Sequence, residues 1–278
     1  MKNNTTSSKF AVEVNDLNYQ FSGSTQEALH DIKLQIPWNS RTLLIGSNGA
    51  GKSTLLKLLA GKQLCLTGEI FINGINPFSS QYRNEQEFGM NTSTYLGTEW
   101  CHMEIINRDI GVLELLDSIG YTRFFKQRGD ELIKILEVDL EWRMHKLSDG
   151  QKRRVQLVMG LLKPFKLLLL DEVTVDLDVV ARSKLLKFLK LETEIRECSV
   201  IYATHIFDGL NEWPLRLIHM SKGSIVQDVD YKKNVVFRND KSGGDIVSTN
   251  GSVIEVEMCK SLHPLALKWL LKDQNTDL

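Results

Sequence analysis

The hydrophobic pattern at the start of the chain is typical of β-strands. From Phe10 to Ile36, short segments of alternating apolar and polar residues are separated by turn residues such as Ser22-Gly23-Ser24. Alternation with a period of two indicates half-buried strands, and such closely spaced turns favour antiparallel pairing. We therefore expect an antiparallel β subdomain here.

The next segment changes character. Thr42 to Ile45 is a short apolar run that ends in a glycine-rich loop. From Ser53 to Ala60 the chain then carries leucines at helical spacing, namely Leu55, Leu56, Leu58 and Leu59. This order predicts a strand, a loop and a helix.

The middle and later parts of the chain predict the fold class. From about Met103 to Phe165 helical patterns dominate, which indicates a helical subdomain. Strands and a helix then alternate at Leu167 to Leu170, Val179 to Glu197, Ser199 to Ala203 and Arg216 to Met220. Such alternation predicts an α/β fold with a parallel sheet and crossover helices.

The two ends of the chain have weaker patterns. Residues 1–9 are polar, and we expect a disordered tail there. Residues 10–233 form the predicted main domain, and residues 234–278 are expected to be a C-terminal extension. In that extension we predict a linker, a strand and a short helix, at Lys241 to Gly244, Ser252 to Glu257 and His263 to Leu271 respectively.

Charge, apolar runs and cysteine spacing indicate which partners and which cellular compartment to expect. With 34 Lys and Arg against 35 Asp and Glu, the net charge of −1 gives no basic field to attract nucleic acid. No apolar run approaches the roughly 18 to 20 residues that cross a bilayer, so no membrane insertion is expected. The 4 cysteines are widely spaced and form no CxxC pair, which favours a reducing compartment. We therefore expect a cytoplasmic protein, with the nucleus as an alternative.

The glycine-rich loop predicts a nucleotide site. It matches the P-loop pattern G-x-x-x-x-G-K-[ST] between a predicted strand and a predicted helix. In such a loop successive amides face phosphate oxygens, the lysine reaches the β- and γ-phosphates, and the hydroxyl binds Mg²⁺. The predicted ATP-binding residues are Gly46, Ser47, Asn48, Gly49, Ala50, Gly51, Lys52, Ser53 and Thr54.

Two carboxylates follow the apolar run at Leu167 to Leu170. Asp171 and Glu172 stand at the end of a predicted buried strand, where open α/β sheets collect ligands. We expect Asp171 to share the Mg²⁺ site with Ser53. Glu172 is then the predicted general base, or the residue that orients the attacking water.

A third motif points to a family. Leu147-Ser148-Asp149-Gly150-Gln151 resembles the LSGGQ signature of ATP-binding cassette (ABC) proteins, with Asp149 in place of the first glycine. Ser148 and Gln151 also fit a capping box that opens a helix from Lys152 to Leu162, and its amides form an anion site. The resemblance implies a RecA-like core, and a signature that closes over ATP bound to a second subunit. A homodimer or heterodimer is therefore expected.

Other residues fall in the family's order. His205 resembles the switch histidine that contacts the γ-phosphate, and Asp178 resembles the aspartate of the loop that crosses the dimer interface. Phe21 lies where the family keeps an aromatic residue against adenine, with Tyr19 as a neighbouring alternative.

Two positions depart from the family pattern. Val173 replaces the proline that usually follows the catalytic glutamate, which removes no functional group. The glutamine that the family places before the helical subdomain is missing, since Thr98 falls in its register and Glu99 follows. The resemblance links that glutamine to Mg²⁺ and to coupling with a membrane domain, so coupling to a transporter is not expected.

Within the family, three segments resemble a soluble subgroup of fungi and plants that lacks transporter domains. These segments are Tyr95 to Trp100, Leu167 to Asp178 and Ala203 to Gly209. A fungal member is associated with the carbon catabolite repressor/Not complex of transcription and mRNA deadenylation. The resemblance therefore implies an ATPase that regulates or remodels a protein complex, with subunits of that complex as candidate partners. Two alternatives stay open: the ATPase subunit of a membrane transporter, and an adaptor that binds ATP without hydrolysing it.

Overall fold

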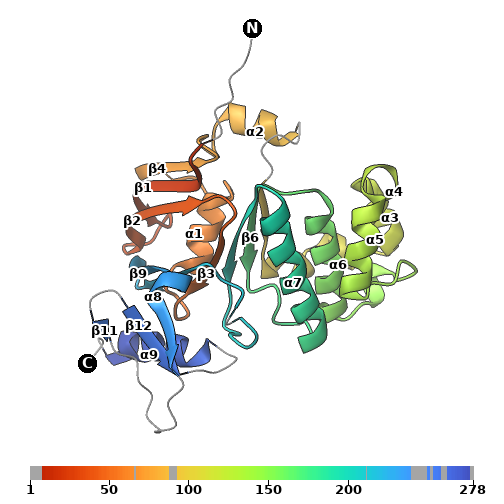
Figure 1. The fold of residues 1–278 in the computed structure, drawn as a ribbon. Coiled ribbons are helices and arrows are strands. Elements are labelled where there is room, and N and C mark those ends of the chain that lie inside the picture. Colours follow the sequence, from red (N-terminus) through yellow and green to blue (C-terminus); the bar gives the residue numbers. More distant parts are fainter. Residues whose placement is uncertain are drawn as a thin grey trace.

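The computed structural model describes residues 8–65, 67–87, 93–210, 212–238, 249–250, 253–257 and 262–275 (Figure 1). The tail predicted at residues 1–9 falls outside these ranges except for Ser8 and Lys9, and the predicted linker at residues 241–244 lies wholly outside them. None of the helices within the described ranges has the length and apolar character needed to span a bilayer.

A six-stranded sheet in the order β5-β6-β7-β3-β8-β9 forms the centre of the molecule. In that order the strands span Ser93–Leu96, Leu167–Asp171, Ser199–Ala203, Arg41–Ile45, Arg216–Ser221 and Ser224–Asp230. Neighbours from β5 to β8 pair in parallel, which confirms the predicted parallel sheet. The edge strand β9 runs antiparallel to β8 and was not predicted from the sequence.

The position of β6 in the sheet explains its four consecutive leucines, because both faces of the strand are buried. Leu168 and Leu170 lie in one hydrophobic cluster with the helices α5 (Lys126–Leu136), α6 (Asp149–Leu162) and α7 (Val179–Ile195). Leu167 and Leu169 lie in a second cluster with α1 (Lys52–Leu59). Because successive side chains of a strand point to opposite faces, a strand covered on both sides has no polar position.

The N-terminal strands form a separate antiparallel sheet in the order β2-β1-β4. β1 spans Phe10–Gln20, β2 spans Glu27–Pro37 and β4 spans Thr67–Ile72. Helix α1, Lys52–Leu59, lies between this sheet and the central one (Figure 1), and its leucines belong to the cluster that joins them. The predicted antiparallel subdomain is confirmed, with β4 as an additional strand.

The opposite face of the central sheet is covered by helices, which Figure 1 shows in yellow to teal. Between residues 98 and 162 the structure is helical, as predicted; the bounds are η1 Thr98–His102, η2 Glu104–Asn107, α3 Val112–Ser118, α4 Tyr121–Phe124, α5 Lys126–Leu136, η3 Met144–Lys146 and α6 Asp149–Leu162. Helix α7, Val179–Ile195, follows β6 and packs beside α5. A further helix, α2 at Ser80–Glu87, follows β4 and was not predicted.

The C-terminal segment packs on the core. It contains α8 at Tyr231–Asn234, β10 at Val235–Arg238, β11 at Thr249–Asn250, β12 at Val253–Glu257 and α9 at His263–Asn275. The boundary predicted after residue 233 therefore falls inside α8. Leu265 and Trp269 of α9 are buried in the same cluster as Phe207 and Trp213. The His219 ring of β8 stacks on Trp269 with ring centroids 4.9 Å apart.

Candidate functional site

The P-loop connects β3 to α1 and wraps around its own lysine. The Lys52 ammonium donates hydrogen bonds to the carbonyls of Gly46 at 2.7 Å and Ser47 at 3.0 Å. Gly51 caps α1 with a φ of 97°, and a Cβ there would lie 2.6 Å from a methyl carbon of Leu29, so both conformation and space require glycine. Burial lowers the pKa of Lys52, opposed by the charges of Glu172 and Asp171.

Asp171, the last residue of β6, contacts the residue that follows Lys52 of this loop. The Ser53 hydroxyl, at the start of α1, donates to Asp171 Oδ1 at 3.0 Å. The Tyr95 hydroxyl of β5 donates to Asp171 Oδ2 at 2.9 Å. Burial, the Asp171 charge and this hydrogen bond raise the pKa of Tyr95, so the phenol keeps its proton. A hydroxyl and a carboxylate are the hard oxygen donors that suit Mg²⁺, so this pair fits the metal expected beside ATP.

Glu172 directly follows the last residue of β6, and its backbone leaves the extended conformation there. Its φ of 56° is left-handed, a conformation that costs a non-glycine residue about 1–3 kcal/mol and concentrates at functional sites. Its Oε1 atom lies 3.0 Å from His205 Nε2, but the contact is not aligned as a hydrogen bond. Among the residues that the structure describes, this buried oxygen therefore has no hydrogen-bond partner. It is an acceptor available to water or ligand.

Burial shifts the proton affinities of this pair in opposite directions. It raises the pKa of Glu172, while the positive charge of Lys52 opposes the shift. It lowers the pKa of His205, and the same lysine lowers it further. The lowered pKa favours the uncharged form of His205, and the raised pKa makes Glu172 a stronger base than an exposed glutamate.

Part of this site borders a cavity of about 1030 Å³, whose lining does not include Gly46, Ser47 or Asp171. Phe21, Glu172, His205 and the loop from Asn48 to Thr54, all of them predicted site residues, line it. Phe21 is 42% exposed, whereas Tyr19 packs against the core and meets Phe21 edge-on at 5.1 Å. Six further lining residues had no sequence signal, because β2 and the turn between β8 and β9 bring them here: Gln26, Glu27, Ala28, His30, Lys222 and Gly223.

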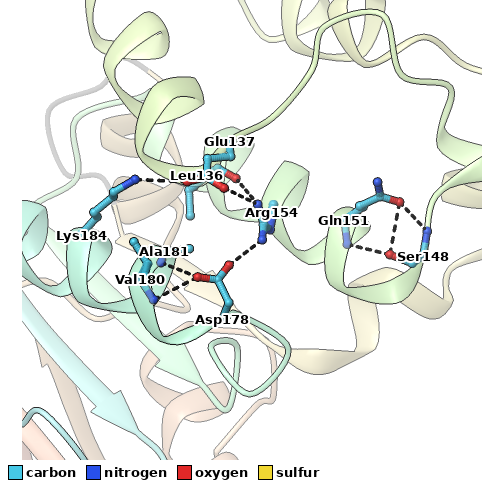
Figure 2. Close-up of polar contacts among 9 residues, drawn as sticks. All are labelled: Leu136, Glu137, Ser148, Gln151, Arg154, Asp178, Val180, Ala181 and Lys184. Carbon is cyan, nitrogen blue, oxygen red and sulfur yellow. Dashed lines mark hydrogen bonds and ion pairs between the residues drawn. The ribbon is translucent and has the colours of Figure 1, made fainter.

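The predicted signature starts α6 as a capped helix. Ser148 is the N-cap, and its hydroxyl accepts from the Gln151 amide at 3.3 Å while Gln151 Oε1 accepts from the Ser148 amide at 3.0 Å (Figure 2). This reciprocal pair confirms the predicted capping box. Ser148, Gly150 and Gln151 line a second hollow of about 400 Å³, together with Asp178.

Asp178 caps the neighbouring helix α7. Its Oδ1 accepts from the amides of Val180 at 3.0 Å and Ala181 at 2.9 Å. Its Oδ2 accepts from Arg154 of α6 at 2.6 Å (Figure 2). Sequence analysis did not single out Arg154, since its acceptor lies 24 residues away in a separate element.

Arg154 also reaches the C-terminal end of α5. Its Nη1 donates to the Leu136 carbonyl at 3.2 Å and lies 3.4 Å from the Glu137 carboxylate. Lys184 of α7 pairs with the same carboxylate at 3.1 Å (Figure 2). The side chain of Arg154 thus joins three helices around the second hollow.

The described linings of the two hollows do not overlap. One chain brings together the P-loop, Glu172 and His205, but it leaves Ser148, Gly150, Gln151 and Asp178 in a different place.

The segment in the register of the missing glutamine has its own contacts. Thr98 begins η1, and its carbonyl accepts from Arg153 at 3.3 Å. The Glu99 carboxylate pairs with Lys57 of α1 at 2.5 Å, and this hydrogen bond lowers the pKa of Glu99.

Comparison with known proteins gives the class to which this arrangement belongs. Residues 29–175 match the family model described as ABC transporter. The chain therefore belongs to the ATP-binding cassette family, whose ATPase domains bind ATP and dimerise. This confirms both the family resemblance and the α/β fold class.

Its similarity to particular proteins is high. CCR4-associated factor 16 of Saccharomyces cerevisiae is 58% identical over 278 residues, covering 96% of each chain. ABC transporter I family member 20 of Arabidopsis thaliana is 42% identical over 231 residues, covering 77% of this chain and 68% of that protein. A bacterial ABC transporter cassette solved as a dimer matches with a TM-score of 0.64 at 20% identity, covering 79% of this chain and 98% of that one, and supports the fold.

Proposed function

We propose that this chain is an ATPase that binds Mg-ATP in the P-loop cavity and hydrolyses it at an interface between two chains. The observation that carries the proposal is the separation of the P-loop cavity from the hollow beside Ser148. A symmetric pair of chains can bring each signature onto the partner's cavity and so form two complete sites. The homodimer is the simplest such pair, and a heterodimer with a related chain is the alternative.

Each predicted residue has a role in this proposal. Lys52 and the amides from Gly46 to Thr54 hold the phosphates at the N-terminus of α1. Phe21 stacks on the adenine base. Ser53 and Asp171 hold Mg²⁺. Across the interface Ser148, Gly150 and Gln151 cover the γ-phosphate, and Asp178 contacts the partner chain.

The chemistry follows from the environment of Glu172. When bound, Mg²⁺ offsets the charge on the β- and γ-phosphate oxygens. The Oε1 atom of Glu172, which has no hydrogen-bond partner among the described residues, accepts a hydrogen bond from the attacking water and orients it, or takes its proton. Because burial raises the pKa of Glu172, the carboxylate is better suited to accept that proton. His205 contacts the γ-phosphate from beside Glu172 and is catalytic together with Lys52.

For the biological role, we propose that the ATP cycle regulates or remodels a protein complex. The name of the yeast relative points to CCR4-containing assemblies, and the carbon catabolite repressor/Not complex is the candidate partner. The Lys57–Glu99 ion pair, next to Thr98 in the register of the family's glutamine, supports a role outside transport. We place the protein in the cytoplasm, with the nucleus as an alternative, and assign residues 10–233 to the ATPase domain and 234–278 to an extension.

Turnover by the purified protein tests this function. We expect the parent chain to release phosphate from Mg-ATP, and Glu172→Gln to bind ATP while losing about 10² to 10⁴ in rate. The variant should also elute as a dimer in sizing chromatography with Mg-ATP. ATP binding without phosphate release by the parent chain would favour the adaptor. Stable co-purification with a polytopic membrane protein would favour the transporter subunit.

A further inference from the structure

The Asp171 carboxylate is held from two sides. Ser53 donates to Oδ1 from α1, and Tyr95 donates to Oδ2 from the edge strand β5. Strand β5 pairs in parallel with β6, with Tyr95 opposite Leu169, so both strands end at the same edge of the sheet. Thr98 falls in the register of the family's glutamine, but the hydroxyl that reaches Asp171 from this segment belongs to Tyr95.

Gly97 provides the space for this contact. A Cβ at position 97 would lie 2.6 Å from the Tyr95 hydroxyl and 2.8 Å from its Cε1, closer than side-chain carbons approach other atoms. The Tyr95 ring is therefore packed directly against the Gly97 backbone. Lys62 lies near the ring as well, with its ammonium 5.3 Å from the ring centroid.

The Gly97 backbone is itself fixed by α6. Its carbonyl accepts from Arg153 at 3.0 Å and from Gln156 at 2.9 Å, and both side chains are buried. Buried, charge-assisted hydrogen bonds hold their partners firmly. A continuous set of contacts thus runs from the helix that carries the signature, through Gly97 and Tyr95, to the carboxylate beside the P-loop.

We propose that Tyr95 is a positioning residue for the metal site, since its hydroxyl holds Oδ2 and thereby keeps Oδ1 of Asp171 directed at Ser53. This inference rests on the proposed function, in which Ser53 and Asp171 would hold Mg²⁺. A carboxylate fixed in advance loses less rotational freedom when it takes up the ion. Tyr95 therefore lowers the Mg²⁺ concentration at which the site fills, without touching the nucleotide.

The Mg²⁺ dependence of nucleotide binding tests this role. Fluorescent ATP is titrated onto the full chain at a series of Mg²⁺ concentrations and again in EDTA. Tyr95→Phe removes only the hydroxyl. It should raise the Mg²⁺ concentration for half-maximal enhancement of ATP binding about three- to tenfold, which matches the net contribution of one ordinary hydrogen bond. Affinity in EDTA should stay at the parent value, a separation that general destabilisation would not produce.

Tyr121→Phe is the matched control. The Tyr121 phenol also donates to a carboxylate, Asp130 Oδ1 at 2.5 Å, but in the helical subdomain. This variant should keep the parent Mg²⁺ dependence. Gly97→Ala displaces the Tyr95 hydroxyl without removing it and should reproduce the Tyr95→Phe shift, which keeps the proposal testable if one variant folds poorly.

Two results would overturn the role of Tyr95: an unchanged Mg²⁺ dependence in Tyr95→Phe or Gly97→Ala, or an equal shift in Tyr121→Phe. A parent chain whose ATP binding ignores Mg²⁺ would instead contradict the proposed function itself. The two failures are therefore distinguishable.

Discussion

Arg154 on the signature helix donates to the Oδ2 atom of Asp178 at 2.6 Å, while the Oδ1 atom of that carboxylate caps α7. The Arg154 side chain is 20% exposed and the Asp178 side chain 47% exposed, so the pair lies on the rim of the second hollow, beside the signature. Within one chain the contact fixes the loop before α7 relative to the signature.

Arg154→Gln should therefore reduce ATP turnover clearly while changing the free energy of unfolding little. A partly exposed ion pair contributes about 0–1 kcal/mol to folding, whereas misplacing an interface group by about 1 Å can reduce rates by as much as 10². Phosphate release and fluorescent-ATP titration should show turnover reduced about tenfold with ATP affinity unchanged, because Arg154 does not line the P-loop cavity. Lys184→Gln, which breaks only the contact with Glu137, is the control and should stay near the parent rate.

Lys52→Ala should abolish tight ATP binding. The desolvated contact between the ammonium and phosphate is worth on the order of a few kcal/mol, which corresponds to about a hundredfold or more in affinity. Fluorescent-ATP titration measures it. Lys57→Ala, on the same helix but paired with Glu99, should bind ATP like the parent chain. An unchanged affinity in Lys52→Ala would remove the P-loop from nucleotide binding.

Mixing two inactive variants tests whether the signature acts on the partner's ATP. Ser148→Arg and Lys52→Ala each damage both sites of a homodimer, so each alone should be nearly inactive. In a mixed dimer one site contains both substitutions. The other site combines the intact P-loop of one chain with the intact signature of the other. We expect the mixture to recover part of the ATPase activity at equal total protein.

Heterodimers in that mixture are first verified with two different tags. Verified heterodimers with no more activity than the single variants would contradict independent sites completed across the interface. A structure of the ATP-bound Glu172→Gln dimer would then show whether the signature faces the partner's P-loop.

Acid should weaken the docking of the C-terminal helix. Burial lowers the pKa of His219 below its ordinary value of 6.5, Lys272 lowers it further, and the Asp273 carboxylate at 3.1 Å opposes the shift. The unfolded chain therefore binds this proton more readily than the folded chain, so the free energy of unfolding should fall as the pH drops below 6.5.

Urea denaturation between about pH 7 and pH 5 measures this slope. His219→Gln should flatten it, since its amide does not titrate. His205→Gln separates the contribution of the second histidine whose pKa burial lowers. A slope in His219→Gln equal to that of the parent chain would exclude His219 as its source.

Much of this protein was predictable because its motifs are local. The P-loop, the Asp171-Glu172 pair and the Ser148–Gln151 capping box each lie within a few residues, and backbone geometry alone fixes their internal arrangement. The leucines of β6 likewise report burial on both faces, and the alternation of strands and helices allows few folds other than a parallel sheet. In this respect the sequence by itself determined the fold class and the local geometry of the P-loop and of the capping box.

Contacts between distant segments were decided by the tertiary structure. Phe21 lines the cavity, whereas Tyr19 packs against the core. Tyr19 lies within β1, and Phe21 follows its last residue, in the turn before β2. Arg154 meets Asp178 because helix packing brings α6 to the N-terminus of α7. Tyr95 meets Asp171 because the sheet order places β5 beside β6. Spacing along a chain fixes neighbours within one element, but which elements adjoin depends on how the whole chain buries its apolar faces.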